Sequence, residues 1–320
     1  MNSFNYILKK IEEAEFIEIP FKFLYIENFL NQSDFDELVN SPLMNTKGES
    51  FDKLNNDLQK NGWEPHLHPG TFKSLGKYLN WRESNLKSSN NSKKKNFEDD
   101  LCEGRGLAYR LNNKLSRKMA ELRNLFLGDE FRNLALKKFN LNSESDDINI
   151  DCGFQKYLHG YEISPHPDIR EKALTWMLNL NTLDNPENNY HTHFQVFKDN
   201  RKYIYDLWKY FPHIQRSWVP WEWCETIFKQ KKNNSITLFS PDSYTLHAIK
   251  ASYNDLNNQR TQLYGNIWYE KIFDSNFQSK FINSSFRDYD YLERFSKTKT
   301  KKVKSLIKLR NLLNISDKKS

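Results

Sequence analysis

The stretch "ISPHPDIREKALTWMLNLN", residues 163–181, places a histidine and an aspartate two positions apart, directly before an apolar segment. In an extended strand alternate side chains share one face, so His166 and Asp168 could point at the same metal ion. The alternative is a surface turn around Pro167, in which the aspartate bonds only to nearby backbone groups. Partners elsewhere in the chain must decide between these two interpretations.

Composition places the chain among globular proteins with a sizeable core. It has 320 residues, of which 38% are hydrophobic and 15% aromatic. The net charge is +7, but eight lysines and one arginine against one aspartate give residues 296–320 a charge of +8, so the remainder is near −1. The body therefore lacks the basic face of a nucleic-acid-binding protein, and we expect no specific nucleic-acid partner. The basic tail is suited to contact an acidic surface, and the oligomeric state is left open.

Cysteine usage and hydropathy bear on the cellular compartment. Cys102, Cys152 and Cys224 are odd in number and widely spaced, which disfavours both a disulfide framework and a zinc knuckle. The N-terminus has no apolar run of the length of a signal sequence, and no segment is long enough to be a transmembrane helix. A cytoplasmic location is expected.

Residues 1–147 are predicted to form an N-terminal bracing region of strand and helix. An alternating strand pattern covers residues 21–26, and Ser33 is a candidate N-cap for a short helix. The polar stretch "SNLKSSNNSKKKNFEDD" predicts an exposed loop near residues 84–100. Helical spacing over residues 107–141, divided at Gly128, predicts two helices that brace a sheet.

Residues 148–272 change to short strands separated by turn signals, with an insertion near 199–234, and residues 273–320 form a basic C-terminal extension. This pattern predicts a mainly β chain with α elements, folded as a barrel or double-sheet jelly roll braced by the N-terminal helices. The predicted strands cover residues 149–157, 161–165, 171–180, 192–197, 223–228, 235–239, 244–250 and 260–269.

Candidate partners for the H-x-D pair lie downstream, in "NSITLFSPDSYTLHAIKASYNDLNNQRTQLYGNIWYE", residues 234–270. This segment reads as three strands, of which the second carries His247 and the third begins at Arg260. Taken alone, His247 could be a half-buried histidine within a strand, and Arg260 a salt-bridged surface residue. The ordered combination with His166 and Asp168 favours a site.

In this ordered set the sequence resembles the Fe(II)- and 2-oxoglutarate-dependent dioxygenases, particularly the prolyl-hydroxylase-like branch, over roughly residues 148–270. The resemblance implies a double-stranded β-helix, with His166, Asp168 and His247 as ligands of Fe(II). It implies 2-oxoglutarate and dioxygen as cosubstrates, with ascorbate as an accessory reductant. Arg260 would hold the far carboxylate of 2-oxoglutarate, because its planar fork suits a carboxylate.

The resemblance also suggests further site residues. Tyr157 matches a tyrosine that helps to hold the cosubstrate, and Asn179 falls on a strand position that can face the pocket. His193, in "NNYHTHFQVF", is a candidate either to face the substrate or to support the residues that bind the metal. Trp221 and Trp223, in "SWVPWEW", are candidate substrate walls, with core packing as the alternative.

The implied function is a hydroxylase of a small molecule, an amino acid or a peptidyl residue, which releases succinate and carbon dioxide. Two alternatives stay open. One is a non-catalytic β-helix that serves as a binding module, and the other is a metal-dependent hydrolase or isomerase on the same fold. In the C-terminal tail, apolar residues at helical spacing among lysines predict a helix that either docks by its apolar face or lies on a membrane surface.

Overall fold

The computed structural model describes residues 3–66, 72, 74–88, 106–111, 113–141, 148–182, 188–212, 214 and 216–269. The chain divides into two compact units, Met1–Ile272 and Phe273–Ser320. The basic extension predicted at 273–320, with its helical repeat, lies outside the described residues. Within the described part, no helix is both long and apolar enough to span a membrane.

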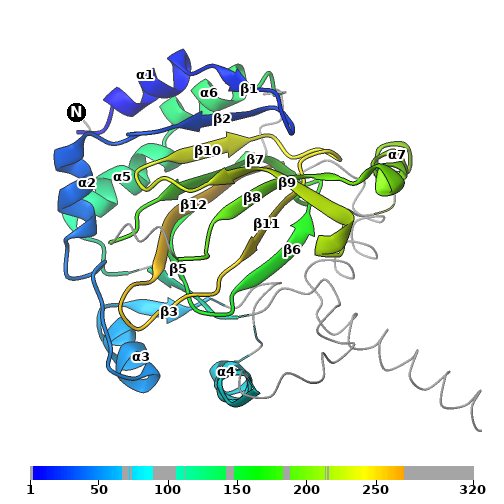
Figure 1. Cartoon of the computed structure of the whole chain (residues 1–320). Coiled ribbons are helices and arrows are strands. Elements are labelled where there is room, and N and C mark those ends of the chain that lie inside the picture. Colours follow the sequence, from blue (N-terminus) through cyan, green and yellow to red (C-terminus); the bar gives the residue numbers. More distant parts are fainter. Residues whose placement is uncertain are drawn as a thin grey trace, which may run out of the picture. The chain divides into compact units, whose positions relative to one another are not determined.

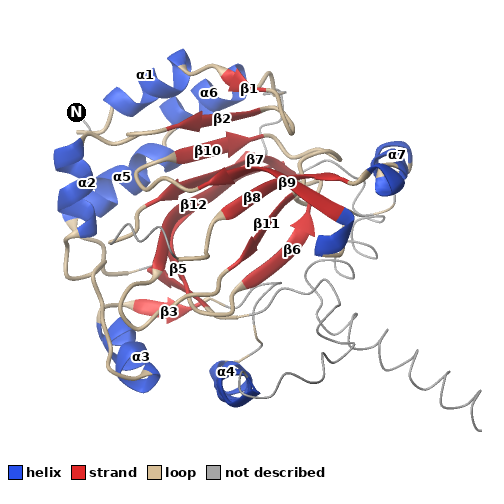
Figure 2. Cartoon of the chain, viewed as in Figure 1, coloured by secondary structure: helices blue, strands red, loops and turns tan. Residues whose placement is uncertain are grey.

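Two antiparallel sheets form the centre of the first unit (Figures 1 and 2). The large sheet has the strand order β1-β2-β10-β7-β12-β5-β4-β3, and the small sheet has the order β6-β11-β8-β9. The strands are β1 (Phe16–Ile17), β2 (Phe23–Ile26), β3 (Trp63–Pro65), β4 (Ala108–Leu111), β5 (Ile148–Tyr157), β6 (Glu162–His166), β7 (Lys172–Asn179), β8 (Thr192–Phe197), β9 (Cys224–Gln230), β10 (Ile236–Phe239), β11 (His247–Lys250) and β12 (Arg260–Tyr269). The expectation of a mainly β chain with helices is confirmed.

The two faces of the large sheet have different chemistry because side chains alternate along each strand. We call the face directed at the small sheet the inner face, since Arg260 of β12 there donates a hydrogen bond to Thr192 of β8. On β5 the inner positions are polar or small, and the outer positions Cys152 and Phe154 enter the main core. On β5 the inner face is therefore polar and the outer face packs into the main core, whereas elsewhere the two sheets also pack on each other through a smaller apolar cluster.

The helices of the described part are α1 (Tyr6–Glu13), α2 (Gln32–Val39), α3 (Phe51–Lys60), α4 (Leu75–Ser88), α5 (Arg117–Leu127), α6 (Asp129–Lys138) and α7 (Tyr203–Tyr210). The helices α1 to α6 add side chains to the main core on the outer face of the large sheet, whereas α7, which follows β8, packs in a separate cluster beside the small sheet. α5 begins at a real N-cap, because the Ser116 hydroxyl accepts from the Met119 N–H, and it ends at Gly128. The buried faces of α5 and α6 join the same core as Phe154 and Trp176 of the sheet. Amphipathic spacing thus predicted these two helices correctly.

The structure corrects three details of the N-terminal region. Residues 108–111, expected within a helix, form strand β4, which is too short for its period to be distinguished. Helix α2 begins at Gln32 after Asn31, so Ser33 lies inside the helix and is not its N-cap. Residues 84–88, expected in a loop, complete α4, whereas residues 89–100 lie outside the described residues.

All eight strands predicted between residues 148 and 269 are present, with ends shifted by at most a few residues. The central pairing is that of β12, which lies between β5 and β7 and aligns Arg260 with Tyr157. In the small sheet, His247 of β11 pairs directly with His166 of β6. These two registers position the site.

Candidate metal centre

His166, Asp168 and His247 come together between the two sheets. β6 ends at His166, Pro167 turns the chain, and Asp168 follows, while β11 begins at the paired His247. Their ligand atoms all lie within 4.8 Å of one another. The Nε2 atoms of His166 and His247 are 4.0 and 3.9 Å from the two carboxylate oxygens of Asp168. All three side chains are buried, so this is an interior cluster and not a surface turn.

Backbone carbonyl groups fix the tautomer of both imidazoles. The Nδ1 atom of His166 lies 2.8 Å from the carbonyl oxygen of Ser164, and that of His247 lies 3.0 Å from that of Thr245. A carbonyl oxygen only accepts, so Nδ1 carries the proton and the Nε2 lone pair faces the cluster. Burial lowers the pKa of His166 to about 3, and burial also lowers the pKa of His247. Both rings are therefore neutral near pH 7, as metal ligands must be.

Asp168 is held as a carboxylate by two neighbours on β7. Lys172 Nζ donates to one oxygen at 2.7 Å, and the Thr175 hydroxyl donates to the other at 2.6 Å. Burial, the largest single effect, would raise the pKa of Asp168, but Lys172, His247 and His166 together outweigh it and lower the pKa. Lys172 also donates to the Tyr264 hydroxyl at 2.9 Å. The carboxylate is thus ionised and fixed in orientation before any metal binds.

The donor set fits a divalent transition metal. Two neutral imidazole nitrogens and one carboxylate form the set of the facial triad, which leaves coordination positions free for other ligands. A structural zinc site would use four protein ligands. Among the described residues, only these three form a histidine, cysteine and carboxylate group close enough to hold a metal ion.

Arg260 is a second buried charge, 3% exposed, in the space between the sheets. Its guanidinium donates to the Thr192 hydroxyl at 2.8 Å and lies 4.8 Å from the centre of the Tyr157 ring. No carboxylate in the described part of the chain forms an ion pair with it, and burial lowers its pKa. A buried cation surrounded by neutral groups favours an anionic ligand.

The register relates Arg260 to the triad. Thr192, which accepts from the guanidinium, pairs with Ile249 of β11. Ile249 lies two residues after His247, which corresponds to about 7 Å along the strand. Thr192, the partner of the guanidinium, and His247 are therefore close neighbours in the small sheet.

The other predicted cosubstrate residues have different surroundings. Tyr157 is buried next to Arg260, and its hydroxyl donates to Gln155 Oε1 at 2.5 Å. Asn179 is also buried, but its amide donates to the Lys232 carbonyl oxygen and its oxygen accepts from Gln262. The structure therefore brings Tyr157, but not the polar atoms of Asn179, to the guanidinium.

His193 lies on the outer face of the small sheet. Its neighbour Thr192 points inward to Arg260, so His193 points away, and its Nδ1 lies 3.0 Å from the Thr226 hydroxyl. Burial lowers the pKa of His193 to about 4. The Trp221 ring lies 5.4 Å from the His193 ring, and its indole donates to Glu162 at 2.7 Å. Neither residue is brought to the triad.

Trp223 packs against a separate apolar cluster beside β8, which contains Phe197, Tyr205 and Trp208. The Arg201 guanidinium lies 4.8 Å from its ring centre. These contacts favour the core-packing alternative for Trp223. Helix α7 contributes its buried residues to the same cluster.

Several site residues escaped the sequence analysis. Lys172 and Thr175 stand four and seven residues after Asp168 and reach it only because β7 begins there. Arg110 and Asp151 form an ion pair on the inner face of β4 and β5. No periodic signal marks such residues, although buried polar positions in an apolar strand are a hint.

Exposure changes along the inner face of β5. Asn149 is exposed, Asp151 is partly exposed, and Gln155 and Tyr157 are buried. The β5 side chains of the inner face are therefore buried next to Arg260 and become accessible to solvent toward Asp151.

Comparison with known proteins gives weak similarities. No family model and no curated protein matches the chain. A prolyl-4-hydroxylase from Pseudomonas putida is 13% identical, with 68% of this chain and 97% of that chain covered and a TM-score of 0.34. A Trichoplax adhaerens prolyl hydroxylase, in complex with a hypoxia inducible factor oxygen degradation domain peptide fragment, is 14% identical, with 77% and 94% covered and a TM-score of 0.30. Neither likeness assigns the chain to a family.

Proposed function

We propose that the chain is an Fe(II)- and 2-oxoglutarate-dependent dioxygenase with a double-stranded β-helix core. The observation that carries the proposal is the pairing of a buried His-Asp-His cluster with a buried arginine that has no carboxylate partner among the described residues. The cluster would hold the metal, and Arg260 would hold the far carboxylate of the cosubstrate. A hydrolase or isomerase that used the same cluster would leave the buried Arg260 without a role.

Each residue has a defined task in this proposal. His166, Asp168 and His247 would bind iron, and bound Fe(II) would supply the redox chemistry by which dioxygen oxidises 2-oxoglutarate to succinate and carbon dioxide. Thr175 and Lys172 keep the Asp168 carboxylate ionised and oriented.

The surroundings of Arg260 supply the other half of the site. The ring of Tyr157 lies beside the Arg260 guanidinium, and both side chains are buried. Because burial excludes water, the guanidinium attracts a carboxylate more strongly here than it would at the surface. The prime substrate, a small molecule, an amino acid or a peptidyl residue, would be hydroxylated after approaching from the accessible side near Asp151.

The test compares two variants that separate the two halves of the site. His247→Ala should lose Fe(II) binding in an anaerobic metal titration and lose all succinate formation. Arg260→Ala should keep the metal but bind 2-oxoglutarate more weakly by about 2 to 5 kcal/mol, the cost of removing one member of a buried charge pair. Arg260→Lys should recover only part of this, because the bidentate geometry is lost.

The alternatives give different results. A non-catalytic binding module would release no succinate with any candidate substrate, even when loaded with stoichiometric iron. Unchanged 2-oxoglutarate affinity in both Arg260 variants would reject the anchor. Full metal binding and turnover in His247→Ala would reject the proposed metal site.

A further inference from the structure

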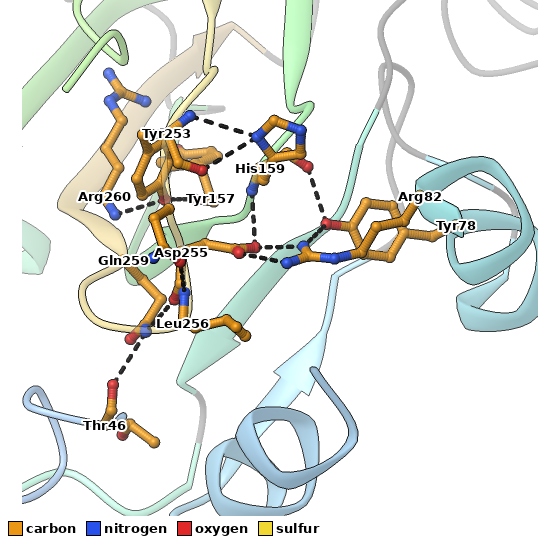
Figure 3. A network of polar contacts seen from close by, with 11 residues as sticks. Thr46, Tyr78, Arg82, Tyr157, His159, Tyr253, Asp255, Leu256, Gln259 and Arg260 are labelled. Atoms are coloured by element: carbon orange, nitrogen blue, oxygen red, sulfur yellow. Dashed lines mark hydrogen bonds and ion pairs between the residues drawn. The ribbon is translucent and has the colours of Figure 1, made fainter. Parts of the chain in front are cut away.

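A buried ion pair joins helix α4 to the loop before β12 (Figure 3). The two terminal nitrogens of Arg82 donate to the two carboxylate oxygens of Asp255, each at 2.7 Å. The side chains are 11% and 1% exposed. Such a planar, two-point pair fixes orientation as well as distance. Arg82 also donates to the Tyr78 hydroxyl at 2.8 Å, so the pair is braced within α4.

Asp255 connects two loops that are far apart in the sequence. It belongs to residues 251–259, which link β11 to β12, and its carboxylate also accepts from the His159 N–H at 2.9 Å. His159 lies in the turn 158–161 between β5 and β6, and its carbonyl oxygen accepts from Tyr78 at 2.9 Å. α4 therefore holds both loops through one carboxylate and one tyrosine.

The same two loops also meet at Tyr253. Its hydroxyl donates to the Tyr157 carbonyl oxygen and accepts from the Arg260 N–H, the latter at 2.8 Å. Its own backbone contacts the His159 ring, with 3.1 Å between the His159 Nδ1 and the Tyr253 carbonyl oxygen. Next to Arg260, the Gln259 amide donates to the Asp255 carbonyl oxygen at 2.7 Å. The backbone at the start of β12 is thus held from both sides (Figure 3).

Each loop crosses from one sheet to the other, between a metal ligand and a cosubstrate residue. The turn 158–161 leads from Tyr157 in the large sheet toward His166 in the small sheet. The loop 251–259 leads from the strand of His247 in the small sheet to Arg260 in the large sheet. The relative position of these two crossings therefore sets the separation between the metal ligands and the guanidinium.

We propose that Arg82 and Asp255 are positioning residues that fix this separation and thereby select the length of the 2-oxo dicarboxylic acid that the site accepts. This inference rests on the proposed function. A dicarboxylate held at both ends can satisfy the metal and Arg260 together only at one spacing. Small displacements of reacting groups carry large costs, about a hundredfold for 1 Å in favourable cases.

The experiment measures dissociation constants of metal-loaded protein, under anaerobic conditions, for oxaloacetate, 2-oxoglutarate and 2-oxoadipate. These acids differ by one methylene at each step. In Arg82→Met, the preference for 2-oxoglutarate over the other two should fall about tenfold or more, while metal affinity stays that of the wild type. Arg82→Lys and Tyr78→Phe are milder changes that test the same point if Arg82→Met does not fold.

Lys118→Met is the matched control. Lys118 forms a part-buried pair with Asp34, 2.6 Å long, between α5 and α2, and it touches neither loop. This variant should lower the thermal midpoint without changing the preference among the three acids. If Arg82 has only a structural role, the Arg82 variants should likewise show a lower thermal midpoint and an unchanged preference among the three acids.

The outcomes separate the two proposals. Wild-type preference in Arg82→Met, or in both milder variants if Arg82→Met does not fold, would overturn the positioning role and leave the proposed function intact. Failure of the wild-type protein to bind any of the three acids would overturn the proposed function and this inference together. The proposal is supported if the preference for 2-oxoglutarate falls in the Arg82 variants and stays at the wild-type level in Lys118→Met.

Discussion

Lys156, at an outer position of β5, has a fully buried amino group. This group should make the free energy of unfolding depend on pH in the range above pH 7. Its Nζ donates to the Met44 carbonyl oxygen at 2.7 Å, the Thr261 hydroxyl at 3.0 Å and Gln259 Oε1 at 3.3 Å. The ammonium also lies 5.0 Å from the centre of the Trp63 ring. All these partners are neutral, and no described carboxylate forms an ion pair with it. The charged form is hydrogen-bonded but not neutralised.

Burial lowers the pKa of Lys156 from 10.5 to about 7. In the unfolded chain the lysine stays protonated up to about pH 10.4, so between pH 7 and pH 10.4 the unfolded state binds more protons. Stability from this group therefore rises with pH across this window and is lost as pH falls toward 7. At 1.36 kcal/mol per pKa unit, the change from pH 7 to pH 10 is about 3 to 4 kcal/mol, because the folded state is still half protonated at pH 7.

The measurement is the free energy of unfolding in urea, for wild type and Lys156→Met, at several pH values from 7 to 10. The difference between the two proteins isolates Lys156 from the tyrosines and cysteines that titrate in the same range. Wild type should gain about 3 to 4 kcal/mol relative to the variant from pH 7 to pH 10.

Lys118→Met serves as the control for a lysine whose pKa changes in the other direction. The Asp34 hydrogen bond raises the pKa of Lys118, so both states are protonated between pH 7 and pH 9 and the difference curve should be flat there. Parallel wild-type and Lys156→Met curves would refute the reasoning, because they would mean that Lys156 stays charged in the folded state throughout.

Three shorter predictions concern the site and its supports. Thr175→Val removes the hydroxyl 2.6 Å from Asp168, so metal affinity should fall about 10- to 100-fold in a metal titration, and unchanged affinity would remove Thr175 from the supporting groups. Gly160 has a φ of +81°, and Gly160→Ala would place a methyl group 2.0 Å from a tryptophan ring of α4, so thermal denaturation should show a loss of stability of about 1 to 3 kcal/mol. Gly76→Ala, which has open space around its Cβ, should show no loss of stability. Trp223→Ala should cost about 1 to 3 kcal/mol of stability, less than for a fully buried aromatic side chain because Trp223 is half-buried, and a stable variant that has lost only substrate binding would support the substrate-wall interpretation.

The alternation and local spacing of apolar residues were sufficient to predict most strands of the β-rich region. The strands from β5 to β12 were predictable because apolar residues recur at strand spacing between clear turns. The association of His166 and Asp168 with His247 was implied by the resemblance, because the strand pattern alone left each of them open to a structural role. The strand β4 was not, because four residues are too few to distinguish a strand period from a helical one.

The outward orientation of His193 has a simple physical origin. Thr192 and His193 are adjacent, and only one of them can face the other sheet. Phe194 is buried with Phe23 and Phe239, so its face is the opposite one from that of His193. The apolar neighbour, and not the metal-binding residue type, indicated the orientation.

Long-range polar pairs could not be predicted from the sequence. Arg82 and Asp255 lie in a helix and a loop that are 173 residues apart, and neither stands in a periodic pattern. Lys172 meets Asp168 only after the chain has turned into β7. Such contacts depend on tertiary structure, which local patterns do not encode.

The direct pairing of β6 with β11 has a consequence for how the protein is maintained in a cell. His166 and His247 belong to strands with four other strands between them in the sequence, so the complete ligand set exists only after the small sheet has closed. A metal ion that binds the closed sheet and not the unfolded chain stabilises the native state by mass action, by about 2.7 kcal/mol at a free concentration of 100 times Kd. The amount of folded protein, and its resistance to proteolysis, would then rise and fall with the supply of the metal.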